Sequence, residues 1–355
     1  MSIIANLSEQ LGQLGSIPRA QLFSGTTVLE TMPNLTAHCG GAQLLVKRDD
    51  CTGLAFGGNK ARQLEFYLGE ARAQDADTII ITSAVQSNFA RMTAAGARKL
   101  GMSCHIQLEE RVATSDRSYR ISGNVMIDKL LGATLHSYPD GEDESGADQQ
   151  LEVIAAELRA SGRRPYIIPL GPGHTPLGAL GYVVAAAELL AQIEENEFQI
   201  DQIFVGSGSG ATHAGLLFGL RALGSDIPVT GVCVRRDATL QRLRIEDTCN
   251  RLATLLDVSS KVSDADINLI DDFLAPGYGI PSDETLSAIV MSARTEGLLV
   301  DPVYTGKVMA AVIREAKNAD KQSSFIFVHT GGTPALFGYE QAIDRALAIE
   351  PEFKP

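Results

Sequence analysis

One lysine of the sequence lies where a reactive amine is expected. The segment "GLAFGGNKARQLE" brings two glycines and Asn59 to the start of a helical pattern whose first turn holds Lys60. Asn59 suits the N-cap position, and a lysine in the first turn meets the positive end of the helix dipole, which favours loss of its proton. Schiff-base chemistry requires such a neutral amine. A solvated lysine after a glycine turn is the alternative, and this segment alone favours neither.

A second segment, "FVGSGSGATHAG", predicts a phosphate-binding turn. An apolar strand runs into Gly206, Gly208 and Gly210, and a helix follows. Successive backbone N–H groups at such a turn bind phosphate, and the hydroxyls of Ser209 and Thr212 add donors. A tight turn without a ligand is the alternative, but three glycines with Ser and Thr exceed what turning requires.

The same turn also fits a different class of protein. Gly206, Gly208 and Ala211 satisfy the dinucleotide pattern G-x-G-x-x-G/A. The next expected strand ends in Arg235 and Arg236, which suit the 2′-phosphate of NADP rather than a free ribose. An NADP-dependent oxidoreductase is therefore an alternative, although it leaves Lys60 without a role.

A third segment, "TSAVQSNFAR", again reads as a strand followed by a helix. Ser87 and Asn88 would offer a hydroxyl, an amide and free N–H groups at a helix start, which can hold a carboxylate. The alternative is that one of them only caps the helix, and the segment by itself favours capping.

These segments lie within an alternation of short Val- and Ile-rich runs with longer stretches of helical period, which predicts βα units on mainly parallel sheets. With 355 residues, the chain exceeds the size of one core, so we expect two lobes. The Gly- and Pro-rich stretch from Leu170 to Gly178 marks a lobe boundary. The charged segment "SYPDGEDESGADQQ" lacks apolar periodicity and predicts a solvated loop without chemistry.

Composition excludes several classes of protein. A net charge of −13 without a basic run disfavours nucleic acid as a partner. No stretch approaches the ~20 apolar residues of a membrane span, and the polar start lacks a signal pattern, so we expect a cytoplasmic protein. Five widely spaced cysteines and six histidines form no disulfide framework or metal-ligand pattern, and no metal site is predicted.

Six ordered segments carry a family resemblance: "KRDDCTGLAFGGNKARQLE", "QSN", "GSGSGATHAG", "PGYGIPSDET", "DPVYTGK" and "VHTGGTPALFGY". The chain resembles the fold-type II pyridoxal-phosphate family of D-cysteine desulfhydrase, 1-aminocyclopropane-1-carboxylate deaminase and L-cysteate sulfo-lyase. The resemblance implies a two-domain α/β fold similar to tryptophan synthase β, with parallel sheets and helices on both faces. It also implies a large discontinuous cofactor-binding domain of residues 1–58 plus 173–355, a small domain of residues 59–172, and a homodimer.

The resemblance also implies roles for single residues. Lys60 would carry pyridoxal 5′-phosphate as a Schiff base and exchange the proton of the substrate α-carbon. Asn88 would hydrogen-bond the phenolic oxygen of the cofactor, Ser87 would seat the substrate carboxylate, and Tyr278 and Tyr304 would lie near substrate and cofactor. Buried packing with a satisfied hydroxyl is the alternative for each tyrosine. The cofactor phosphate would be held by the turn residues Gly208, Ser209, Gly210, Ala211 and Thr212.

Two threonines distinguish the subfamilies. Thr305 stands where the deaminase has a glutamate, and Thr330 stands where it has a leucine before the paired glycines. A neutral hydroxyl facing the pyridine nitrogen stabilises less charge than a carboxylate and suits loss of a good β-leaving group. The resemblance therefore implies a pyridoxal-phosphate-dependent lyase that eliminates the β-substituent of a small amino acid. D-cysteine desulfhydrase activity, with release of sulfide, pyruvate and ammonia, is favoured over L-cysteate sulfo-lyase, and cyclopropane ring opening is disfavoured.

One position departs from the family pattern. Relatives commonly carry a histidine after "QSN", whereas this chain has Phe89. A ring that faces the pocket would favour a more apolar substrate or another leaving group, and a ring in the core would not. The sequence leaves that choice open, together with the chirality of the substrate.

Overall fold

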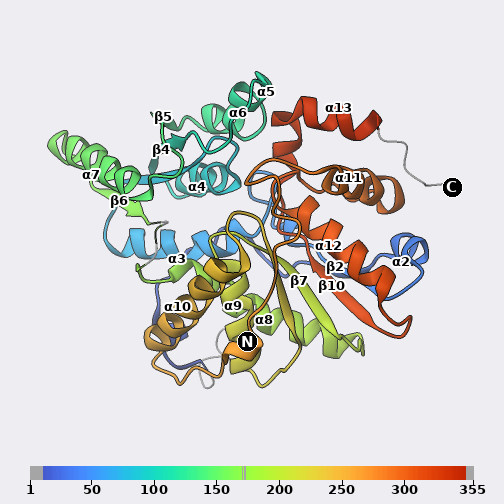
Figure 1. Cartoon of the computed structure of the whole chain (residues 1–355). Coiled ribbons are helices and arrows are strands. Elements are labelled where there is room, and N and C mark those ends of the chain that lie inside the picture. The colour runs from blue at the N-terminus through green and yellow to red at the C-terminus, as the bar shows by residue number, and fades with distance from the viewer. Residues whose placement is uncertain (1–10, 170, 172, 349–355) are drawn as a thin grey trace.

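The computed structural model describes residues 11–169, 171 and 173–348, and these residues form two β-sheets flanked by helices (Figure 1). The larger sheet has six strands in the order β1-β2-β10-β7-β8-β9. Its pairs are parallel except for β1, which lies antiparallel to β2. The strands are β1 (Leu29–Thr31), β2 (Gln43–Lys47), β10 (Ser324–Val328), β7 (Gln202–Ser207), β8 (Val229–Cys233) and β9 (Asn268–Ile270).

The smaller sheet has four parallel strands in the order β5-β4-β3-β6. They are β5 (Thr134–Tyr138), β4 (Ser103–Glu109), β3 (Thr78–Ala84) and β6 (Pro165–Ile168). Every residue of β3 is buried, because α4 and α7 both pack against this central strand. Such two-sided burial explains why β3 is apolar at successive positions rather than at alternate ones. The helices of this part are α3 (Lys60–Ala73), α4 (Asn88–Lys99), α5 (Ser118–Ile121), α6 (Gly123–Leu130) and α7 (Glu144–Ala160).

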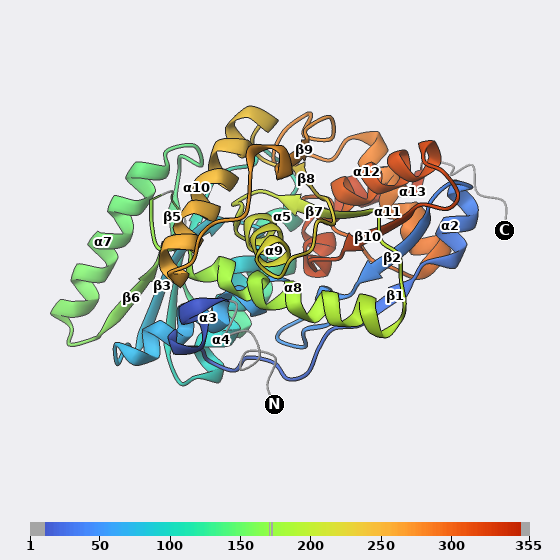
Figure 2. The same cartoon turned by 90° about the horizontal axis from the view of Figure 1, so that it is seen from below.

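The remaining helices accompany the six-stranded sheet. They are α2 (Pro33–Cys39), α8 (Leu177–Glu195), α9 (Ala211–Ala222), α10 (Ala238–Leu256), α11 (Asp283–Glu296), α12 (Thr305–Asn318) and α13 (Glu340–Ala348). Short 3-10 turns occur at η1 (Gly12–Ser16), η2 (Asp49–Cys51), η3 (Asp264–Asp266) and η4 (Thr333–Gly338). Figure 2 shows α7 and the smaller sheet at one end, β2, β10 and α12 at the other, and α8 and α9 between them.

Helix α8 joins the two parts of the molecule. It packs against both α3 and α9, so one core contains residues from the lysine helix and from the helix after the glycine turn. Among the described residues, α8 is also the helix whose length and mean hydropathy of 1.4 would suit a membrane span. Because 67% of that stretch is buried inside the protein, its apolar character is explained by its position in the core.

The predicted α/β class with parallel sheets is confirmed. The predicted domain boundaries stay a prediction, and Leu170 and Pro172 of the expected boundary stretch lie outside the described residues. The prediction for the charged segment after β5 is wrong in part: α7 begins at Glu144, capped by Asp143. Its buried residues Ala147, Leu151, Ile154 and Ala155 have helical spacing. The quoted segment ended before most of them, so the period was not visible within it.

Candidate active site

A cavity of about 500 Å³ lies at the carboxyl ends of the parallel strands, where α/β folds bind ligands. Its wall includes Ala84 at the end of β3, Glu109 at the end of β4 and Gly206 near the end of β7. The first residues of α3, α4 and α9 line it as well. The three segments predicted to carry chemistry therefore meet at one site.

Lys60 lines this cavity from the first turn of α3. Its amine donates a hydrogen bond to Gln63 Oε1 over 3.1 Å. Burial lowers the pKa of Lys60 to about 8, because a low-dielectric environment disfavours the charged form. At pH 7, about a tenth of these amines is then neutral, far more than for a solvated lysine. Burial is the cause of this lowering.

The lysine helix and the glycine turn are connected directly. The hydroxyl oxygen of Thr212 accepts hydrogen bonds from Gln63 Nε2 and from Asn59 Nδ2, each over 2.8 Å. Asn59 does occupy the N-cap position of α3, but its side chain makes no capping bond. The N-cap position predicted for Asn59 is therefore confirmed, without a capping bond from its side chain. Its amide instead ties the start of α3 to the start of α9.

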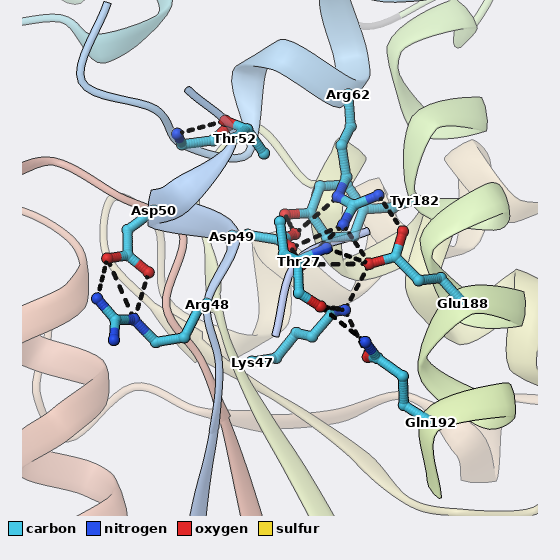
Figure 3. A network of polar contacts seen from close by, with 11 residues as sticks. Thr27, Lys47, Arg48, Asp49, Asp50, Thr52, Arg62, Tyr182, Glu188 and Gln192 are labelled. Carbon is cyan, nitrogen blue, oxygen red and sulfur yellow. Dashed lines mark hydrogen bonds and ion pairs between the residues drawn. The ribbon is translucent and has the colours of Figure 1, made fainter. Parts of the chain in front are cut away.

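A buried network of charges anchors the helix that carries Lys60 (Figure 3). Arg62, in the same first turn of that helix, donates to both carboxylate oxygens of Asp49 over 2.9 and 3.0 Å. It also donates to both oxygens of Glu188 on α8, over 2.8 and 2.9 Å. Lys47 at the end of β2 reaches the same glutamate over 2.5 Å. All four side chains are almost completely buried, so the network fixes α3 relative to β2 and α8.

The glycine turn has the shape that a phosphate requires. Gly210 adopts a left-handed conformation with φ of 96° at the start of α9. A Cβ atom on Gly208 would lie 3.1 Å from Val234 and 3.6 Å from the ring of Tyr304, so a side chain there would crowd the cavity wall. The first N–H groups of a helix have no intrahelical acceptor. Gly208, Ser209, Gly210, Ala211 and Thr212 all line the cavity, as predicted.

Ser87 and Asn88 both face the cavity at the start of α4. Ser87 Oγ caps this helix by accepting from the N–H groups of Phe89 and Ala90, over 3.1 and 3.2 Å. The capping interpretation is therefore correct, and it is compatible with a role in binding because the hydroxyl proton of Ser87 remains free to donate. Phe89 belongs to the core and also lines the cavity, so its ring takes both of the positions that the sequence left open.

The two predicted tyrosines form a pair in the cavity wall. Their hydroxyl oxygens are 2.6 Å apart, and the rings of Tyr278 and Tyr304 meet edge to face. Burial, followed by the proximity of Tyr278, raises the pKa of Tyr304 well above its usual value, so Tyr304 keeps its proton. A proton can therefore pass between the hydroxyls of Tyr278 and Tyr304.

The two distinguishing threonines have different positions. Thr330 lines the cavity, whereas Thr305 is fully buried and is not part of the described wall. The hydroxyl of Thr305 donates to Asp301 Oδ2 and accepts from the Asp301 N–H, each over 2.7 Å. The structure therefore does not support Thr305 as a residue that contacts the cofactor, because its hydroxyl is used to shape the start of α12. Of the two threonines, Thr330 alone lines the cavity.

The sequence prediction missed a charged cluster on the cavity wall. Glu144, at the start of α7, accepts from Arg236 over 2.7 Å and from Arg235 over 3.0 Å. Arg244 lies near the same carboxylate. Burial, together with Arg244 and Arg235, lowers the pKa of Arg236 to about 10. The paired arginines were visible in the sequence as a mark of NADP binding, but their partner lay in the segment predicted to carry no chemistry.

Comparisons with known proteins agree with this geometry. A family model described as pyridoxal-phosphate dependent enzyme matches residues 20–331, and the chain belongs to that family. D-cysteine desulfhydrases of Salmonella typhi and of Yersinia enterocolitica serotype O:8 are 40% and 42% identical to it. Each alignment covers 93% of this chain and 98% of the relative.

Two solved structures are also similar. A crystal structure described as an ACC deaminase homologue has a TM-score of 0.84 and 34% identity, and the match covers 98% of this chain and 99% of the other. A structure of O-ureido-L-serine synthase, at 16% identity and a TM-score of 0.64, shares the fold. The fold-type II prediction is confirmed.

Pyridoxal 5′-phosphate is therefore the cofactor of this family, and the cavity fits it. A buried lysine amine of lowered pKa and an open glycine turn at a helix start lie on one wall, which suits an aldehyde and a phosphate. The alternative of an NADP-dependent oxidoreductase is wrong. Arg235 and Arg236 pair with Glu144, and the chain belongs to a family with another cofactor.

Proposed function

We propose that this protein eliminates the β-substituent of a small amino acid, with D-cysteine as the principal substrate. D-cysteine and water would yield sulfide, pyruvate and ammonia. One observation carries the proposal: a lysine amine of lowered pKa, a free serine hydroxyl and a tyrosine pair share one cavity. Relatives 40% and 42% identical over nearly their whole length are D-cysteine desulfhydrases.

Pyridoxal phosphate, when bound, supplies an electron sink for negative charge at the α-carbon of an amino acid. The task of Lys60 is to take the α-proton. Its pKa of about 8 lies near neutral pH, where a general base works best. Gln63 holds the amine through a 3.1 Å hydrogen bond, and it is itself held by Thr212.

The substrate carboxylate would bind at the start of α4. Both N–H groups nearest to Ser87 already donate to its oxygen, so the hydroxyl is oriented to donate outward into the cavity. The positive end of the helix favours an anion at this place. Asn88 would face the phenolic oxygen of the cofactor and Thr330 its ring nitrogen, and both residues line the cavity.

The tyrosine pair would serve the leaving group. When the carbon–sulfur bond breaks, sulfur keeps the electron pair and needs a proton. The hydroxyls of Tyr278 and Tyr304 lie 2.6 Å apart, so a proton given by one can be replaced through the other. A neutral Thr330 near the ring suits a leaving group that departs readily, as sulfide does.

A keto-acid assay over a matched panel tests this function. D-cysteine, L-cysteine, L-cysteate, β-chloroalanine, D-serine and 1-aminocyclopropane-1-carboxylate would be compared at equal concentration. We expect the largest kcat/KM for D-cysteine, with equal amounts of sulfide and pyruvate. Sulfite release from L-cysteate at a higher kcat/KM would instead assign sulfo-lyase activity. Keto acid formed without sulfide, from the cyclopropane substrate alone, would refute the proposal.

Two variants assign the roles within the site. Lys60→Ala should abolish keto-acid release and the visible absorption of the lysine-bound cofactor. Tyr278→Phe should keep that absorption and lower kcat for D-cysteine by about 10- to 100-fold, since general acid catalysis contributes about 10² or more. The effect of Tyr278→Phe on β-chloroalanine should be several-fold smaller, because chloride leaves without a proton. An equal loss on both substrates would refute the proton-donor role.

We further propose a cytoplasmic homodimer. All five cysteines are free thiols, which suits a reducing compartment. Apolar side chains of α5, α6 and η4 are exposed on elements that contact one another, namely Ile121, Met126, Leu130 and Phe337. Such a patch marks an interaction site. Light scattering should give twice the chain mass, and Leu130→Glu with Phe337→Glu should give the monomer. A wild-type monomer would contradict the dimer.

A further inference from the structure

Arg91 is a fully buried arginine one turn beyond Asn88 on α4. One of its nitrogens, Nη1, donates to Asn88 Oδ1 over 2.9 Å and to Asn124 Oδ1 over 2.7 Å. The other, Nη2, donates to the carbonyl oxygen of Gly57 over 2.8 Å. A single guanidinium thus contacts the helix of Asn88, the start of α6 and the turn that precedes Lys60.

These contacts fix which way the Asn88 amide points. A guanidinium can only donate, so the oxygen of Asn88 rather than its nitrogen must face Arg91. The same reasoning applies to Asn124, whose oxygen also faces Arg91. Its nitrogen in turn donates to Asn88 Oδ1 over 3.2 Å. Two donors occupy the Asn88 oxygen from behind, and its amide nitrogen is left to face the cavity that Asn88 lines.

Asn124 is itself held in place. Its backbone N–H donates to Gln86 Oε1 over 3.0 Å, and Gln86 Nε2 donates to the carbonyl oxygens of Tyr119 and Ser122. The orientation of Asn88 is therefore set by a chain of matched donors and acceptors, in which Arg91 Nε is the buried donor without a partner among the described residues. Buried networks of this kind favour one arrangement, because each reversed amide would leave polar atoms unpaired.

The contact with Gly57 extends the effect to the lysine. Gly57 and Gly58 adopt positive φ angles of 64° and 129° just before Asn59 and Lys60. Thr52 Oγ1 accepts from Gly58 N over 2.9 Å and donates to Gly58 O over 3.0 Å. Arg91 closes this turn from helix α4. The guanidinium consequently ties the turn that precedes Lys60 to the helix that carries Asn88.

We propose that Arg91 is a positioning residue, which presents the amide N–H of Asn88 to the phenolic oxygen of the cofactor and holds the lysine turn opposite it. This inference rests on the proposed role of Asn88. It adds a requirement that Asn88 alone does not show. The amide N–H of Asn88 can donate into the cavity only while the guanidinium of Arg91, which contacts no ligand, holds the amide oxygen.

Cofactor binding to the cofactor-free protein tests the proposal without any substrate. The probes are pyridoxal 5′-phosphate and its 3-deoxy analogue, which lacks the phenolic oxygen. Wild type should prefer the natural cofactor by about tenfold or more, the value of one hydrogen bond to a charged oxygen. Arg91→Gln should reduce that ratio to about threefold or less, and Arg91→Lys should restore part of it. An equal weakening of both ligands, with the ratio unchanged, would show a merely structural role.

Arg98→Gln is the matched control. Arg98 lies two turns along the same helix and also donates to backbone carbonyls, those of Leu131 and Gly132, but its side chain is exposed. It should leave the ratio at the wild-type value, and a ratio lowered by Arg98→Gln would overturn the specificity claimed for Arg91.

A second variant tests the proposal if Arg91→Gln fails to fold. Asn124→Ala removes one donor to Asn88 and one acceptor of Arg91, and it should lower the ratio by about threefold. A wild-type ratio in Asn124→Ala would contradict the proposal. Asn88→Ala should abolish the preference for the natural cofactor over its 3-deoxy analogue. If the preference persisted, the roles proposed for both Asn88 and Arg91 would be wrong. None of these readouts depends on which amino acid is the substrate, so a failure of the proposed elimination is seen separately.

Discussion

The amine of Lys60 lies 5.1 Å from the centre of the Phe89 ring. The ring therefore covers the amine on one side, and on another it meets Tyr67 in the core, with centroids 6.3 Å apart. A cation near a ring face gains some stabilisation, yet the pKa of Lys60 is lowered to about 8, so the loss of hydration prevails. Phe89 therefore departs from the family pattern at a position next to the reactive amine.

Replacement of Phe89 should change the basicity of Lys60. Phe89→Ala admits water to the amine, and we expect the pKa of Lys60 to rise by about one unit toward its usual value. Phe89→Leu keeps an apolar cover and should leave the pKa near 8. The rate of reductive methylation of Lys60 against pH, in the cofactor-free protein, measures both. A pKa near 8 in Phe89→Ala would mean that other groups desolvate the amine.

Removal of the Lys60 amine should stabilise the cofactor-free protein. The pKa of Lys60 is lower in the folded chain than in the unfolded chain, so below about pH 8 folding buries a charge at a cost. We expect the free energy of unfolding of Lys60→Met at pH 7 to be about 3 kcal/mol higher than that of wild type, because the pKa of Lys60 falls from 10.5 to about 8 on folding. As pH rises from about 8 to 10.5, wild type should gain stability and the difference should shrink. Urea unfolding at pH 7 and 10 would show a constant difference if this account were wrong.

The network of Figure 3 should be sensitive to loss of a single charge. Asp49→Asn leaves Arg62 and Lys47 with Glu188 as their remaining carboxylate in that network, and we expect a loss of about 3–5 kcal/mol of unfolding free energy at pH 7. Arg242→Gln, which breaks an exposed pair with Asp264, should cost less than about 1 kcal/mol. Denaturant titration compares the two.

Acid should remove the advantage of the Asp49 carboxylate. Burial raises the pKa of Asp49, but the charge and the hydrogen bonds of Arg62 together lower it by more. The pKa of Asp49 therefore lies below its usual value. Such a group stabilises the fold above its unfolded pKa and ceases to do so as pH falls through its folded pKa. The difference in unfolding free energy between wild type and Asp49→Asn should therefore become smaller below about pH 4. A difference that grows there would contradict this role of the Asp49 carboxylate.

Glu144 should hold the three arginines of the cavity wall in place. Glu144→Gln leaves Arg235, Arg236 and Arg244 facing one another without their shared carboxylate, and we expect KM to rise about three- to tenfold with kcat nearly unchanged. Because this is an electrostatic effect, 1 M salt should reduce it. Glu152→Gln, on the exposed side of the same helix, is the control. A lower kcat with an unchanged KM would place Glu144 in the chemistry instead.

Much of the fold and the site could be predicted because the signals are local. A strand, a glycine turn and a helix start follow one another within a dozen residues at Gly206 to Thr212, and a strand, a short turn without glycine and a helix start do so around Ser87. Each predicts its own conformation, and strands of one parallel sheet bring such turns to the same edge. The family resemblance then supplied the link between Lys60 and Thr212, which lie far apart in the chain.

The remaining features depend on side-chain direction and on contacts between distant segments. Glu144 meets Arg236 across 92 residues, and no local pattern pairs them. Thr305 and Thr330 were equivalent by type, but the backbone at the start of α12 turns Thr305 toward Asp301. Arg91 read as an ordinary helix residue, since a period of 3.6 places it on a face without stating what that face meets.

The order of strands has a consequence for synthesis of the protein. β10 lies between β2 and β7 in the larger sheet, although it is the last strand in the described chain. Until Ser324 and the residues after it have been synthesised, β2 and β7 lack the strand that joins them. Thr330 follows β10 directly, so the cavity wall and the middle of the sheet become complete in the same late step. Premature termination before Ser324 would therefore leave two unjoined half-sheets with exposed edges, a natural substrate for chaperones and proteases.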